Sequence, residues 1–153
     1  MKEQYLQDDV FYVCTLIEYI ARKTKNHRQD VVKHFTISDI LYQLEAAPMN
    51  HCLSLEQVSD EVIEDYHISE GSFDTVKECR YRVPSETDIG RVYQNLVLSL
   101  YEDNYAQGIR DVFSSFISDE ISNFNSNICY SNQDYLKFSF QKGYMLPEVE
   151  KPE

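Results

Sequence analysis

Apolar residues recur at helical spacing along most of the chain. Between residues 10 and 21 they leave only a narrow polar stripe, which is typical of a central helix packed on several sides. The stripe consists of Asp8, Tyr12, Thr15, Tyr19 and Arg22. The clearest amphipathic pattern covers residues 109–124, where apolar side chains from Ile109 to Phe124 share one face opposite serines and aspartates. We therefore expect one long helix there.

Capping residues divide the rest of the chain into further helices. Thr36 or Ser38 can cap a helix over 37–47 that Pro48 ends, and Ser54 with Gln57 reads as a capping box. The pattern predicts helices over 31–35, 37–47, 55–67, 72–79 and 85–100, the fourth capped by Ser72 and the last opened by Ser85 with Asp88. Residues 104–108 are expected to interrupt the helical structure before the long amphipathic helix.

The segment 128–140 allows two interpretations. Leu136, Phe138 and Phe140 alternate with polar residues as in a strand, so a small β-hairpin is one alternative. We favour a helix that starts at Ser131 and stops at Gly143. The tail, 147–153, is expected to be disordered.

Together these elements predict an all-α fold. The sequence has only four glycines and four prolines, too few for a barrel or sandwich with many tight turns. At 153 residues, one domain is the default. We therefore expect a single compact, bundle-like domain of about six to eight helices over 1–146, with a candidate subdomain joint near 83–85.

The negative charge is concentrated in one part of the chain. The net charge is −12, and residues 38–79 contain ten acidic residues but only one base, Lys77. Such a field repels nucleic acid and favours a basic protein partner. The alternative is that the acidity only keeps the protein soluble.

The predicted helix over 55–67 has an unusual outward face. Glu56, Asp60 and Glu64 follow one another at a spacing of four, and Glu61 and Asp65 flank them, with no base inside the helix. Like charges at this spacing each cost about 0.2–0.5 kcal/mol. Folding gives no reason to keep this arrangement, so these five carboxylates are our candidate partner-binding residues.

The sequence has no recognisable cofactor or catalytic motif. It lacks a glycine-rich phosphate loop, a zinc-protease motif and a calcium loop, and His51, Cys52, His67 and Cys79 match no zinc spacing. We expect no cofactor and no metal. The four cysteines are expected to be reduced, although a Cys52–Cys79 disulfide is an alternative.

The amino-terminal residues are polar and acidic, and no stretch approaches the roughly 18 apolar residues of a membrane span. We therefore expect a cytoplasmic protein that does not enter a membrane.

One spacing points to chemistry. Arg22 precedes His27 by five residues, which resembles the R-x4-6-H motif of HEPN-type ribonucleases. The resemblance implies that Arg22 would hold a phosphate and His27 would move a proton. Arg28 and His34 satisfy the same loose pattern, and the acidic segment that follows opposes RNA binding.

The first half of the chain also resembles a known family. Residues 8–67 share the apolar order of a short, uncharacterised, all-helical bacterial family, notably in 10–19, 31–42 and 58–66. Members of that family are often encoded beside ADP-ribosyltransferase-like toxin genes. The resemblance implies a bacterial protein with a protein partner, in an antitoxin-like or immunity-like role, and it transfers no functional residue.

Three functions follow as hypotheses. We favour a non-catalytic acidic module that occludes a basic partner protein through Glu56, Asp60, Glu61, Glu64 and Asp65. The first alternative is a small ribonuclease that uses Arg22 and His27. The second is a structural homo-oligomer, such as a dimer, built on the 109–124 face.

Overall fold

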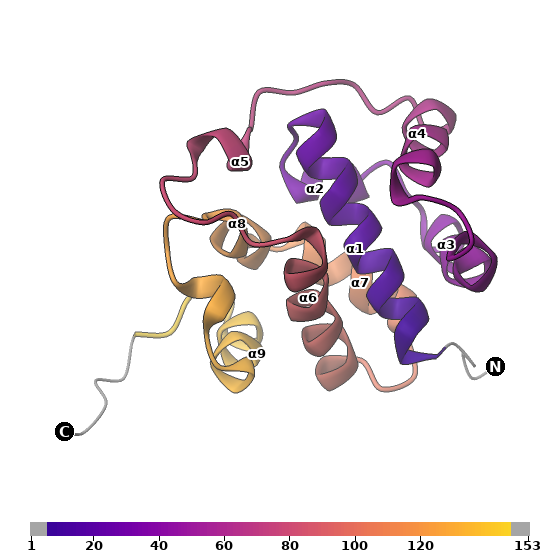
Figure 1. Cartoon of the computed structure of the whole chain (residues 1–153). Coiled ribbons are helices and arrows are strands. Elements are labelled where there is room, and N and C mark those ends of the chain that lie inside the picture. The colour runs from indigo at the N-terminus through magenta and orange to yellow at the C-terminus, as the bar shows by residue number, and fades with distance from the viewer. Residues whose placement is uncertain (1–5, 148–153) are drawn as a thin grey trace.

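The computed structural model describes residues 6–147, and within them the chain is all-α, as predicted (Figure 1). The elements are α1 (Gln7–Thr24), α2 (Arg28–Val32), α3 (Ile37–Asn50), α4 (Leu55–Asp65), α5 (Thr75–Glu78), α6 (Glu86–Leu100), α7 (Tyr105–Ser114), α8 (Phe116–Ser122), the 3₁₀ helix η1 (Ile128–Tyr130) and α9 (Gln133–Lys142). This part of the chain has nine α-helices, more than the six to eight expected, and no strand.

The helix α1 lies at the centre of the fold. Figure 1 shows α6 alongside α1, with α3 and α4 on the other flank of α1 and with α8 and α9 beyond α6. The pair α1 and α6 makes the most extensive helix contact. One hydrophobic core runs from α1 to α9, and Val83 packs against it, so the residues on either side of the predicted joint near 83–85 share a core.

The polar stripe predicted on α1 is wrong for two of its residues. Tyr12 and Thr15 are buried, because α1 is covered by neighbouring helices on this side as well. Gly90 of α6 lies directly against Thr15, and a β-carbon added to this glycine would come within 2.1 Å of Thr15 Oγ1. The missing side chain at Gly90 therefore sets how closely α1 and α6 approach.

The single helix predicted over 109–124 is in fact two helices. The backbone is extended at Ser115, with φ −84° and ψ 169°, so α7 ends and α8 begins there. The Ser115 hydroxyl donates to the carbonyl of Val112 and accepts from the amide of Ile117, which caps both helix ends. The apolar periodicity does not reveal this break, because both α7 and α8 bury apolar side chains in the core.

Several predicted helix ends also shift. α3 continues past Pro48 to Asn50, with the proline in its last turn. α5 is capped by Asp74 instead of Ser72, and it begins only at Thr75. Gly108 does not interrupt a helix but lies inside α7, against the ring of Tyr101. The link before α7 is therefore shorter than predicted.

The carboxyl-terminal segment forms a helix, and the alternative of a β-hairpin near 128–140 is wrong. α9 is capped by Asn132, one residue after the predicted Ser131. It stops at Gly143, whose φ of 86° is in the left-handed region that glycine tolerates. Of the tail predicted to be disordered, 148–153 lie outside the described residues.

Tyr101 gives the fold a predictable response to alkaline pH. Its hydroxyl donates to Asp111 Oδ2 at 3.0 Å, and burial, together with this hydrogen bond, raises the pKa of Tyr101 to about 12. An unfolded tyrosine ionises near pH 10. Because the folded pKa is the higher one, the contribution of Tyr101 is complete below about pH 10 and is lost as the pH rises towards 12.

We therefore expect Tyr101→Phe to reduce the loss of stability at high pH. The check is urea unfolding of both proteins between pH 8 and pH 11.5. The stability difference between wild type and variant should shrink above about pH 10. A difference that stays constant over this range would contradict the assigned role of Tyr101.

Candidate functional site

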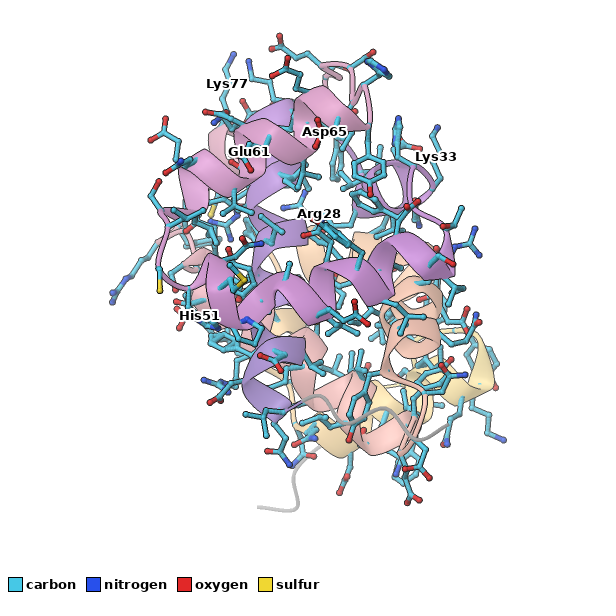
Figure 2. The ribbon with its side chains drawn as sticks, turned by 90° about the vertical axis from the view of Figure 1, so that its right-hand side faces the viewer. Arg28, Lys33, His51, Glu61, Asp65 and Lys77 are labelled. Atoms are coloured by element: carbon cyan, nitrogen blue, oxygen red, sulfur yellow. The ribbon has the colours of Figure 1, made fainter. Side chains whose placement is uncertain are left out.

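The five carboxylates predicted as a partner-binding face lie on α4 and are all exposed. Ser54 caps the helix by accepting from the amide of Gln57 at 3.1 Å, and Val58 and Val62 anchor the opposite side in the core. This register turns the five carboxylates, Glu56, Asp60, Glu61, Glu64 and Asp65, towards solvent. Figure 2 shows Glu61 and Asp65 along the near, outer side of α4.

No base lies inside α4, but Asp60 has a counterion from another helix. Lys23, near the end of α1, donates a hydrogen bond to Asp60 Oδ1 and forms an ion pair with it. This hydrogen bond raises the pKa of Lys23, and the charge of Glu56 adds to the effect. The stripe formed by Glu56, Asp60 and Glu64 therefore borders α1 and is partly neutralised by the chain itself.

The remaining acidic face lies at the end of α4. Within residues 6–147, Glu61, Glu64 and Asp65 have neither an ion-pair partner nor a side-chain hydrogen bond, and the last turn of α4 contains no base. The carboxyl end of a helix carries partial negative charge, so acids there are unfavourable by about 0.3–1 kcal/mol each. We call Glu61, Glu64 and Asp65 the α4 acidic end.

The two residues of the ribonuclease hypothesis serve different structural roles. Arg22 donates from Nε to Glu18 Oε2 at 2.7 Å, and its side chain is only 8% exposed. His27 is half-buried, and its Nδ1 lies 2.8 Å from Asp119 Oδ1. Because Arg22 is held by a buried carboxylate and is almost fully covered, its guanidinium is not presented to a phosphate in solvent.

The interior contains an ion-pair cluster that the sequence pattern did not reveal. Arg28 and Glu18 are both completely buried, and Arg28 Nε donates to Glu18 Oε1 at 2.8 Å. A second Arg28 nitrogen donates to Glu18 Oε2 at 2.5 Å and to Thr75 Oγ1 at 3.2 Å. Burial alone lowers the pKa of Arg28, but the charge and hydrogen bonds of Glu18 outweigh burial and raise it.

A cavity of about 530 Å³ lies beside this cluster. Its walls come from His27, residues 72–75 with Glu78, and the end of α8 with residues 123–125. The ring of His27 stacks on Phe73 with centroids 3.7 Å apart, and Asp119 holds the ring by its Nδ1. Sequence reasoning missed this site because His27 and Asp119 are far apart in the chain.

The structure bears on three further expectations. All four cysteines are free, so Cys52 and Cys79 are not bonded to each other. Among residues 6–147 no group of three or more histidines, cysteines or carboxylates is placed to hold a metal ion. No helix in this range has both the length and the apolar character needed to cross a membrane.

The face proposed for a homo-oligomer belongs to the core of the subunit. Ile109, Val112, Phe113, Ile117 and Ile121 are all 0% exposed within a single chain. A second copy therefore cannot pack on this face without unfolding the first, and the interface predicted over 109–124 is wrong.

Comparison with known proteins gives no match to a family model, a curated protein or a solved structure. The resemblance of residues 8–67 to a toxin-associated family therefore stays a prediction.

Proposed function

We propose that this protein binds a basic protein partner through the outer face of α4 and acts by occlusion, without turnover. The observation that carries the proposal is the α4 acidic end, where three exposed carboxylates have no counterion within the described chain. The mutual repulsion of the three carboxylates opposes folding, and so does the position of Glu64 and Asp65 in the last turn of the helix. A binding partner with Lys and Arg side chains would supply the missing positive charge.

The correction at Asp60 narrows the proposed surface. Glu61, Glu64 and Asp65 form its centre, while Glu56 and Asp60 lie at its edge, beside Lys23. An antitoxin-like or immunity-like role, as the family resemblance implies, is consistent with such a surface. The ribonuclease alternative loses support, because its arginine is bound to Glu18.

We expect the double variant Glu61→Lys with Asp65→Lys to lose partner binding. The matched control is Glu102→Lys with Asp103→Lys, which makes the same charge change at two exposed residues outside α4. Wild type and both variants are immobilised, exposed to extract of the source cells at low salt, and the retained proteins are identified.

The proposal predicts a basic protein that wild type and control retain, that the α4 variant releases, and that elutes as salt is raised. The same set of proteins on all three matrices would contradict it. So would the loss of a partner from the control alone.

A further inference from the structure

The cavity between α5 and α8 contains polar groups that the proposed function does not use. Figure 1 shows α5 and α8 on the opposite side of α1 from α4, so this site is separate from the α4 acidic end. We propose that the cavity binds a small organic cation with a guanidinium group.

The charge of the lining supports a cationic ligand. Asp74, Glu78 and Asp119 line the cavity, and no lysine or arginine is among the described residues that do so. Behind this lining, Arg28 at Thr75 and Arg22 at Phe124 share the single carboxylate of Glu18. The lining itself presents three carboxylates against one histidine.

The contact with Asp119 determines which ring nitrogen of neutral His27 carries the proton. An ionised carboxylate can only accept hydrogen bonds, so the proton of neutral His27 is on Nδ1, facing Asp119 Oδ1. The other ring nitrogen, Nε2, is then an acceptor, and it has no hydrogen-bond partner within the described residues. Gln29 Nε2 donates to Asp119 Oδ2 at 3.2 Å, which holds the carboxylate in place.

The other polar groups leave mainly acceptors free for a ligand. Asn125 uses its amide within the protein, since Oδ1 accepts from the amide of Arg80 and Nδ2 donates to the carbonyl of Glu78. Asp74 uses one carboxylate oxygen to cap α5, and the side chain of Glu78 has no partner in the described chain. A ligand that matches these free acceptors must donate hydrogen bonds.

Two further features indicate a binding site instead of a solvated acidic surface. Ser122 lines the cavity, is only 2% exposed, and its hydroxyl has no hydrogen-bond partner. The rings of Phe73 and Phe124 add apolar surface to the cavity, where His27 covers one face of Phe73 and the guanidinium of Arg22 lies over one face of Phe124.

The test is a two-dimensional amide NMR titration of the full chain with L-arginine amide. The matched control ligand is L-citrulline amide, which has nearly the same shape and keeps the α-ammonium but has a neutral urea in place of the charged guanidinium. We expect saturable shifts at residues 72–75 and 122–125 with arginine amide and none with citrulline amide.

A pair of variants locates the contact. Glu78→Gln should weaken the binding of arginine amide about three- to tenfold, whereas Glu102→Gln, an equal change at an exposed carboxylate elsewhere, should not. Three results would each overturn the proposal. They are shifts of equal size with citrulline amide, no saturable shift in this region, and equal effects of the two variants. No protein partner is needed, so failure here is distinct from failure of the α4 proposal.

Discussion

Replacing Arg28 by methionine is expected to lower the free energy of unfolding by about 3–5 kcal/mol. Arg28 is completely buried, and it binds both carboxylate oxygens of Glu18, which is also completely buried. Methionine fills similar space but leaves the carboxylate with Arg22 as its only cation and leaves Thr75 Oγ1 without its donor. In a chain of this size the melting temperature should fall by about 6–20 °C.

Arg91→Met is the matched control. Arg91 is exposed, and it stacks over Phe11 at 3.9 Å and donates to Gln94, so we expect a loss below about 1 kcal/mol. Urea unfolding of both variants measures the difference. A loss for Arg28→Met no larger than that for Arg91→Met would show that the buried pair does not hold α1, α2 and α5 together.

The second large effect is expected at Gly90. A methyl group there would approach Thr15 Oγ1 to 2.1 Å and the Thr15 α-carbon to 3.0 Å. The second contact is with the backbone, so the two helices must move apart. Overpacking of this kind costs about 1–3 kcal/mol, which exceeds the gain of up to about 1 kcal/mol that alanine brings to a helix interior.

Changes at Thr15 separate packing from helix propensity. Thr15→Ala removes the closest atom, so the double variant with Gly90→Ala should recover part of the lost stability. Thr15→Ser keeps the hydroxyl and should not restore it. If Gly90→Ala alone unfolds at the same urea concentration as wild type or higher, the close approach of α1 and α6 is not limited by this glycine.

The sequence predicted the helical fold where local signals agree with tertiary packing. Ser85 and Asp88 form a capping box at the predicted start of α6, and Gly143 ends α9 as expected. Periodicity failed where packing decides between two local structures. The extended backbone at Ser115 keeps the apolar face of α7 and α8 in register, so the apolar pattern alone contains no sign of the break.

The sequence pattern also did not reveal which charged residues pair with each other. Glu18 occurs in a segment rich in apolar residues, and nothing local shows that it meets Arg28, ten positions later. The same holds for Asp60, whose counterion Lys23 comes from another helix. Exposure of the α4 carboxylates, in contrast, follows from helical geometry once Val58 and Val62 are placed in the core.

The central claim is that α4 keeps its acidic end for a partner and not for its own fold. The most direct measurement is the free energy of unfolding of Asp65→Lys beside Asp134→Lys. The lysine at 65 would be four residues after Glu61 and at the carboxyl end of α4, so we predict a gain of about 0.5–1 kcal/mol. Asp134 is in the first turn of α9, where the same change should lower stability. A loss of stability in Asp65→Lys as large as that in Asp134→Lys would contradict the claim, because the carboxylate would then serve the fold.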